Sequence, residues 1–278
     1  YARTSAKNDA RILISLRQFV QDYQKFHSQL PALAANISSQ VFKGDIPYEK
    51  YLPTDLKTLY LGEVHNIPGV PHEVRALLRA LPKLYPNRPI YLATEFVPAD
   101  EKNPFSLDNV LTQPKQVADY LQGTRRFVRP VLYEAVNAGI GVIGLEEEHA
   151  LFRKVWREVK SFPNEGQYIE YATSFDGMRF RNRAWARRLR ALRAAQPDAL
   201  IVVYAGFAHV GYHRDFSLPR LLGKDAFVML FTTPDFLKYN NPLFRYLRED
   251  DTICKQFRSS KNAKLVESWK KATPLKKI

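Results

Sequence analysis

Acidic and imidazole side chains follow four short apolar segments of this 278-residue chain, at the points where those segments end. The endings are Gly-Glu-Val-His-Asn at 62–66, Glu95, Glu-Glu-Glu-His at 146–149 and Gly-Phe-Ala-His at 206–209. Histidine and carboxylate groups together can ligate a divalent metal ion. They can also supply a general base and the group that orients it. The sequence therefore predicts one polar site, provided that the fold brings these endings together.

Each of these residues also has a structural interpretation when it is taken alone. A glutamate after a strand is commonly a loop residue or a neighbour of a helix start, and a single histidine is commonly a hydrogen-bonded bystander. The recurrence of the pattern favours function for Glu63, His65, Glu95 and His209.

The remaining histidines carry weaker signals. His27 lies in a predicted helix and is expected to be structural, whereas His72 and His149 lie near predicted helix starts. His213 comes four residues after the last of the four endings, which is a spacing that places two histidines on one helix face. Gly211 lies between them and disfavours a helix there.

The elements that must position these side chains alternate between strands and helices. Apolar runs predict strands at 58–62, 89–95, 139–146, 200–205 and 226–231, and helical patterns fall at 71–84, 113–123, 127–138 and 176–195. Strands separated by helices of this length are typical of an α/β fold with a mainly parallel central sheet and helices on both faces. Sites in such sheets form beyond the carboxyl ends of the strands, so the polar endings are expected at one edge.

The chain is expected to form one structural domain with three parts. Residues 1–53 are an N-terminal helical extension and a linker, because apolar residues at helical spacing run from 8 to 33 and Pro31 marks the approximate end of that helix. Residues 54–235 form the α/β core. Residues 236–278 form a basic C-terminal segment.

Positive charge is the unusual feature of the composition. The 42 Lys and Arg residues outnumber the 28 Asp and Glu residues, which gives a net charge of +14. Seven arginines and no acid fall between 179 and 193, and most of them are expected to be solvated. The segment 255–278 holds eight basic residues and one acid; it is expected to be a solvated terminus, with an anionic membrane surface as the alternative partner. No base-reading motif accompanies the charge, so a nucleic-acid partner is not expected.

Other features of the sequence bound the class of protein. The single Cys254 excludes an internal disulfide and a cysteine-clustered metal site. The longest apolar stretch, at 200–208, is much shorter than the ~20 residues that a membrane-spanning helix needs. The sequence starts at Tyr1 and not at Met, so we expect that it was processed or cut from something longer. A signal peptide, a lipid anchor and a neighbouring domain are the alternatives for the missing part, and the first two would agree with a periplasmic, secreted or membrane-anchored protein.

Four motifs, in their order along the chain, resemble a known superfamily. They are Gly-Glu-Val-His-Asn at 62–66, the strand ending Leu-Ala-Thr-Glu-Phe at 92–96, Arg-Asn at 181–182 followed by Trp-Ala at 185–186, and Ala-Gly-Phe-Ala-His-Val at 205–210. The superfamily includes the erythromycin esterases, the Tiki Wnt-inactivating metalloproteases, the TraB/pheromone-shutdown proteins and the ChaN-like lipoproteins. The chain most resembles the ChaN-like branch, over residues 57–222.

The resemblance implies a hydrolase that cleaves an ester or amide bond of a small molecule or a peptide. The implied site contains Glu63, His65, Glu95 and His209 with Arg181 nearby. In the hydrolytic members such residues hold a divalent metal ion or activate water without one. The metal set implied here is His65, Glu95 and His209, and Arg181 would stabilise the oxyanion.

Two departures from the ChaN-like pattern accompany this resemblance. His72 lies seven positions after the first motif's histidine, where family members often have five or six, and Trp185 stands where they carry methionine. The superfamily also contains haem-binding members. A haem- or iron-binding protein without catalysis, and a ChaN-like domain of a larger toxin or effector, are therefore the alternatives.

Overall fold

The structure is a computed structural model of the chain, and it describes ten stretches of it. These are residues 37–42, 47–50, 52–63, 70–100, 109–120, 128–159, 162–210, 216–223, 226–232 and 264–269. The predicted helix at 8–33 lies outside the described residues, as do His27, His65 and His213.

A seven-stranded sheet, with strand order β1-β7-β6-β2-β5-β3-β4, forms the centre of the fold. The strands are β1 (Ile37–Phe42), β2 (Thr58–Glu63), β3 (Ile90–Pro98), β4 (Gly141–Glu146), β5 (Leu200–Gly206), β6 (Ala226–Thr232) and β7 (Lys264–Trp269). The five neighbours β6, β2, β5, β3 and β4 are all parallel. β7 pairs antiparallel with both β6 and β1. The predicted mainly parallel sheet is thus confirmed.

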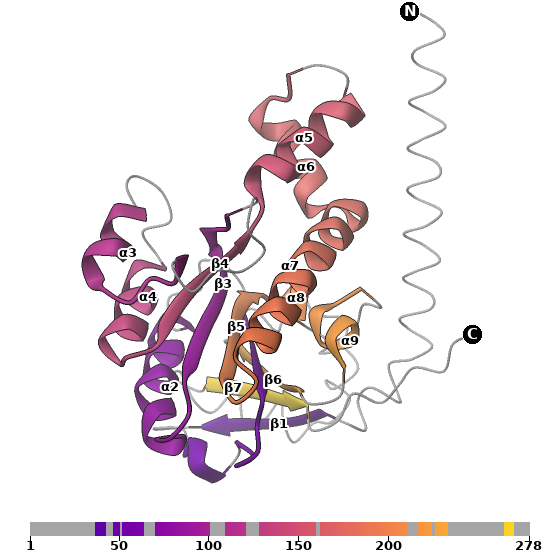
Figure 1. The fold of residues 1–278 in the computed structure, drawn as a ribbon. Helices are drawn as coiled ribbons and strands as arrows, with labels where there is room; N and C mark the ends of the chain where they lie inside the picture. Colours follow the sequence, from indigo (N-terminus) through magenta and orange to yellow (C-terminus); the bar gives the residue numbers. More distant parts are fainter. Residues whose placement is uncertain are drawn as a thin grey trace, which may run out of the picture.

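Helices lie on both faces of this sheet, as the sequence predicts (Figure 1). They are α2 (Val70–Leu84), α3 (Pro114–Tyr120), α4 (Arg129–Asn137), α5 (Glu148–Val159), α6 (Glu165–Thr173), α7 (Phe175–Ala195), α8 (Phe207–Val210) and α9 (Leu218–Leu222), with a 3-10 helix at Tyr48–Lys50. α2 and α4 cover one face, and α7 covers the other. α5 and α6 project beyond the carboxyl ends of the strands.

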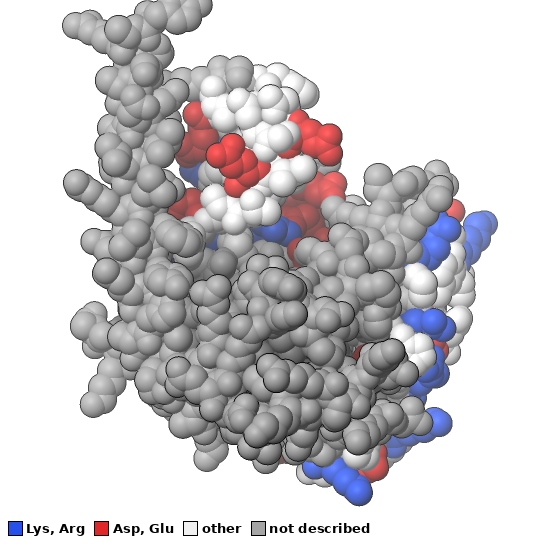
Figure 2. All heavy atoms as spheres, turned by 180° about the vertical axis from the view of Figure 1, so that it is seen from behind, with Lys and Arg blue, Asp and Glu red and all other residues white. Residues whose placement is uncertain are grey.

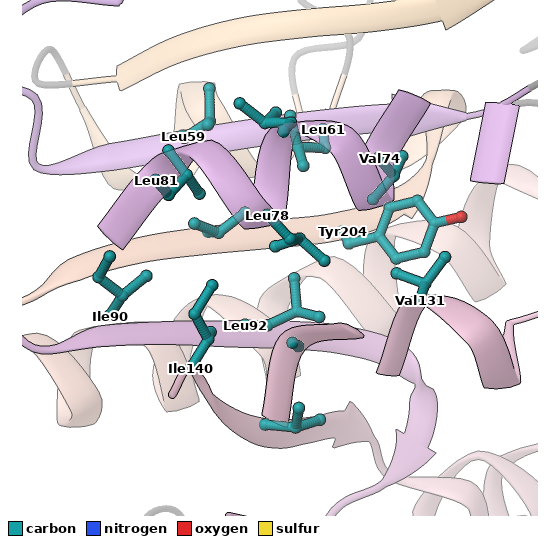
Figure 3. Close-up of a cluster of buried hydrophobic side chains, with 14 of the residues drawn as sticks. Leu59, Leu61, Val74, Leu78, Leu81, Ile90, Leu92, Val131, Ile140 and Tyr204 are labelled. Atoms are coloured by element: carbon teal, nitrogen blue, oxygen red, sulfur yellow. The ribbon is translucent and has the colours of Figure 1, made fainter. Parts of the chain in front are cut away.

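Alternating side chains of the parallel strands build two separate cores. Leu59, Leu61 and Leu92 pack with α2 and α4 on one face, together with Tyr204 (Figure 3). On the opposite face Val203 packs with α7. Every residue of the central strand β5 is buried, which explains why its sequence is the most continuously apolar of the chain.

The edge strands β1 and β7 are the main difference from the predicted organisation. Both lie outside the predicted core of residues 54–235, in the linker and in the basic segment that was expected to be solvated. Their pairing is long-range in sequence, since Ile37 lies opposite Trp269. These strands carry little local signal, because pairing between distant segments does not show in the sequence of either one.

Helix caps fix the position of α7, which carries part of the site. The Ser174 side chain accepts a hydrogen bond from the backbone N–H of Gly177, at 3.1 Å, and so caps the helix. A Cβ atom at Gly177 would overlap the backbone carbonyl of Tyr171, so glycine is what lets α6 meet α7 this closely.

No helix among the described residues is long and apolar enough to cross a membrane.

Candidate functional site

The polar side chains meet at the carboxyl edge of the sheet, where β3, β4 and β5 end. Glu95 comes from β3, Glu146 from the last position of β4, and His209 from α8, which directly follows β5. Arg181 and Asn182 reach them from the second turn of α7. Five side chains from four segments of the chain thus form one hydrogen-bonded network.

Arg181 lies at the centre of this network. Its Nε and Nη2 atoms donate to Oε2 of Glu146, at 2.8 and 2.5 Å, and Nη2 also donates to Oε2 of Glu95, at 2.9 Å. Its Nη1 atom lies 3.2 Å from Nε2 of His209. The side chain is only 13% exposed, so these are charge-assisted hydrogen bonds in a poorly hydrated environment.

The neighbours of His209 determine which of its ring nitrogens carries the proton. Asn182 donates from Nδ2 to the carbonyl oxygen of Phe216, at 2.9 Å, so its Oδ1 faces His209 Nδ1, at 2.5 Å. That oxygen only accepts, so Nδ1 carries the proton. Arg181 only donates, so Nε2 presents its lone pair. His209 is therefore a neutral imidazole with a basic nitrogen directed at the arginine and at Glu95, whose Oε2 is 3.9 Å away.

A break in the strand register positions Glu95. β3 and β4 pair regularly up to Thr94, and the register then shifts before Pro98 pairs with Glu146. Irregularities of this kind re-aim side chains at the edge of a sheet. Oε1 of Glu95 accepts a hydrogen bond from the backbone N–H of Gly206, at 2.5 Å, which ties β3 to the end of β5.

Trp185 forms the apolar wall of the site. Its ring lies 4.4 Å from the His209 ring, centroid to centroid, and the Arg181 guanidinium carbon lies 5.0 Å from the Trp185 centroid. Trp185 is completely buried, so it keeps water away from one side of both polar groups. Trp185 also makes a cation–π contact with Arg181.

Glu63 occupies a neighbouring position and not the centre of the network. It ends β2 opposite Gly206 of β5, and it accepts a hydrogen bond from the Tyr204 hydroxyl. β5 separates β2 from β3, so the axes of those two strands lie about 10 Å apart. Glu63 is 2% exposed, and with Tyr204 it forms a second buried polar pair beside the network.

Two groups at this edge have shifted pKa values. Burial lowers the pKa of Arg181, but the charges of Glu146 and Glu95 outweigh it, together with their hydrogen bonds, and the net shift is upward. Arg181 therefore stays a cation at any physiological pH. Burial raises the pKa of Tyr204, and the charge of Glu63 raises it further, so this hydroxyl stays protonated and acts as a donor.

The sequence predicts that most arginines of α7 are solvated, but two of them make hydrogen bonds that hold the structure around the site. Arg188 is buried; it donates to Glu147, at 3.1 Å, and to the backbone carbonyl of Asp100. Arg193 donates to the backbone carbonyls of Ala199 and Lys57. These bonds satisfy loop carbonyls at both ends of the sheet, a function that the composition of the segment does not reveal.

Two of the three predicted metal ligands, Glu95 and His209, are described, and their arrangement leaves no room for a metal ion between them. Glu95 and His209 both direct their facing atoms at Arg181, which fills the position between them. Among the described residues no group of three or more His, Cys, Asp and Glu side chains is arranged to hold a metal ion. The third predicted ligand, His65, lies outside those residues. A metal site therefore stays a prediction that depends on His65.

Sequence reasoning names three of the five network residues as site residues. Glu95, His209 and Arg181 are brought together, whereas Glu63 bonds to Tyr204 instead. Glu146 and Asn182 are noticed in the sequence but given no role, and Tyr204 is missed. Glu146 could have been found, because it ends a predicted strand as Glu95 does. His72 and His149 lie outside the network; the side chain of His72 is 67% exposed, and it bonds Glu73.

Comparison with known proteins adds one distant structural neighbour. No family model matches the chain, and no curated protein matches it. A solved structure described as the type III effector HopBA1 aligns with a TM-score of 0.38 and 17% identity, and the alignment covers 57% of this chain and 70% of that one. A likeness at this level carries no inference about fold or activity.

Proposed function

We propose that this chain is a hydrolase that cleaves an ester or amide bond of a small molecule or peptide. Water would be activated by His209, and the negative charge that develops on the carbonyl oxygen would be stabilised by Arg181. The proposal combines the resemblance of the four sequence motifs with the bonding of these two side chains.

The observation that carries the proposal is the placement of a largely buried arginine, Arg181, between two carboxylates and a basic imidazole nitrogen. Buried ion pairs add little to the stability of a protein, because the cost of desolvating the two charges offsets much of their attraction. Two glutamates, Glu95 and Glu146, bond the single guanidinium of Arg181. Because His209 is neutral, these four side chains together carry one excess negative charge. Such costly arrangements occur preferentially at functional sites, where they pre-organise charge.

The proposed reaction begins when the carbonyl group of the substrate accepts a hydrogen bond from Nη1 of Arg181. That bond replaces the 3.2 Å contact from Nη1 to His209 and leaves the Nε2 lone pair available. Nε2 then takes a proton from a water molecule while the water oxygen bonds to the carbonyl carbon. The tetrahedral intermediate carries its negative charge on the oxygen next to Arg181. On its collapse the carbon–heteroatom bond breaks, and the imidazolium returns the proton to the leaving alcohol or amine.

The other residues of the network would position these two. Asn182 holds the His209 ring and its tautomer, as buried carboxamides and carboxylates commonly do for a general base. Glu95 and Glu146 fix the guanidinium plane. His65 is predicted to complete the site, as a base or as a ligand of a divalent metal ion that would polarise the substrate carbonyl.

Hydrolysis of a panel of chromogenic esters and fluorogenic peptides tests this proposal. His209→Ala should lower kcat/KM by about 10²–10⁴-fold, which is the usual contribution of a general base. Arg181→Met should lower it by about 10²–10³-fold, as loss of an oxyanion donor does. His149→Ala, at an exposed histidine of α5, is the matched control and should leave the rate unchanged.

Two results would count against the assignment. Wild-type turnover in His209→Ala would show that this imidazole is not the base. Loss of all turnover on dialysis against EDTA, restored by a divalent metal, would move water activation from His209 to a metal ion. The haem alternative stays a prediction and gains no support from the described site, where His209 bonds Arg181 and Asn182 and Tyr204 bonds Glu63.

A further inference from the structure

The hairpin formed by α5 and α6 carries an unusual surface. Among the described residues the large apolar side chains that stand exposed are Trp156, Phe162 and Ile169, which are 49%, 76% and 51% exposed. All three fall within this one hairpin, which projects beyond the sheet (Figure 1). Apolar side chains scattered singly over a surface need no explanation, but a cluster at a projecting element indicates a binding surface.

Three aromatic rings build the centre of this surface. Phe152 and Trp156 lie one helical turn apart on α5, with their ring centroids 6.2 Å apart. Phe162, which precedes α6, packs edge-on against both, at 5.2 and 6.1 Å. The three rings contact one another, so the exposed parts of Trp156 and Phe162 form one continuous aromatic surface.

We propose that this aromatic hairpin docks the protein on the surface of a lipid bilayer, with Trp156 and Phe162 inserted at the headgroup level. Trp and other amphipathic aromatic side chains favour this depth, because one part of the ring system is apolar and another part can stay hydrated. The docking surface is separate from the proposed hydrolytic site and does not depend on its chemistry.

The size of the surface favours a bilayer over a protein partner. An aromatic side chain carries about 150–250 Å² of surface, so the exposed parts of Trp156 and Phe162 offer on the order of 250 Å². A stable protein interface buries about 800 Å² on each partner. Only about 57% of such an interface is apolar, or roughly 450 Å² on each partner. The exposed apolar area of Trp156 and Phe162 is well below that, whereas a bilayer accepts individual side chains without a matching shape.

The charges of the hairpin indicate that apolar insertion carries the binding. The described hairpin holds the basic residues Arg153, Lys154 and Arg157 against four acids, Glu148, Glu158, Glu165 and Glu170. Lys154 and Glu158 neutralise each other, at 2.8 Å. Figure 2 shows this lobe from behind, with acidic side chains around uncharged surface. The hairpin is therefore close to neutral, and it is expected to bind zwitterionic lipid without needing anionic headgroups.

Sedimentation of the full chain with vesicles tests the inference. Wild-type protein should pellet with phosphatidylcholine vesicles, and the double variant Trp156→Ala/Phe162→Ala should lose at least about tenfold in partitioning, since binding scales with inserted apolar area. Trp156→Phe should retain binding. The double variant His149→Ala/Thr173→Ala removes two exposed polar side chains of the same hairpin and serves as the matched control. Tryptophan emission should shift to the blue with vesicles, and less so in Trp156→Phe, which keeps only Trp185 and Trp269; Trp185 is already buried.

Three results would overturn the inference. One is failure of the wild type to pellet with any vesicle. Another is binding that requires phosphatidylserine and is unchanged in the double alanine variant, which would assign it to basic residues elsewhere. The third is a dimer in light scattering that the double variant dissociates, which would make the aromatic surface a protein interface. Unchanged circular dichroism would show that the variants fold, which is expected because Trp156 is about half exposed and Phe162 is mostly exposed.

Discussion

Replacement of Arg181 by methionine measures how much the charge of this side chain contributes to the stability of the folded protein. Methionine keeps the unbranched shape of the side chain but removes the charge that Glu95 and Glu146 share. Both carboxylates are at most 7% exposed, so water can replace little of what is lost. Breaking a buried ion pair in this way costs about 3–5 kcal/mol. Arg181→Met should therefore lower the free energy of unfolding by about 3–5 kcal/mol.

The triple variant Arg181→Met/Glu95→Gln/Glu146→Gln tests the cause of that loss. Glutamine keeps an acceptor for the Gly206 N–H, which now bonds Glu95, but it carries no charge. If uncompensated negative charge is what destabilises Arg181→Met, the triple variant should recover most of the loss, because replacing a whole buried ion network by neutral groups is often close to neutral in stability. Its kcat/KM should stay about 10²–10³-fold below that of the wild type, as in Arg181→Met.

Urea unfolding followed by circular dichroism measures both effects. Arg183→Met is the matched control, since Arg183 is exposed on the same helix two residues away, and it should cost less than about 0.5 kcal/mol. The reasoning fails if Arg181→Met costs no more than Arg183→Met. It also fails if the triple variant is as unstable as the single one, because the loss would then come from packing against Trp185 and not from charge.

Three further measurements address single contacts. Tyr204→Phe should reduce the loss of stability at alkaline pH. The pKa of Tyr204 is raised in the folded state, so the contribution of its hydroxyl to the free energy of unfolding is fully present below about pH 10 and disappears as pH rises above that value. Curves of unfolding free energy against pH that superimpose for both proteins would contradict this. Asn182→Ala removes buried hydrogen bonds to His209 and Phe216 and should cost about 2–4 kcal/mol, while Asn182→Asp, which keeps the acceptor for His209, should keep more activity than Asn182→Ala. Gly177→Ala places a Cβ against the backbone of α6 and should cost about 1–3 kcal/mol in urea unfolding; a cost near zero would show that α6 can move away from α7.

The parallel core could be predicted because its signals are local. All five parallel strands are found within about three residues of their expected bounds, since a strand that is buried on both faces must be continuously apolar. Long helices such as α7 are found for a similar reason, because their apolar stripe and the proline after them are visible in the sequence. The strands β1 and β7 are not predicted, because their pairing leaves no local pattern in the sequence: β1 pairs with β7 more than 200 positions away, and β7 pairs with β6 across 33 to 41 positions.

The site could be predicted only to the level of which strand ends meet. Topology brings the carboxyl ends of parallel strands to one edge, and that places Glu95 and His209 near each other without any knowledge of side-chain packing. Which side chains then bond depends on rotations that the sequence does not encode in a short motif. The register shift in β3 directs Glu95 toward Arg181, whereas the regular end of β2 leaves Glu63 with Tyr204.

Residues that position others are the hardest to recognise in a sequence. Asn182 follows Arg181 directly, and on a helix successive residues point about 100° apart, so both would be expected to serve different surroundings. They serve one site because His209 lies between them: Arg181 reaches its Nε2 and Asn182 reaches its Nδ1. Arg181 and Asn182 therefore contact the two ring nitrogens of the same imidazole.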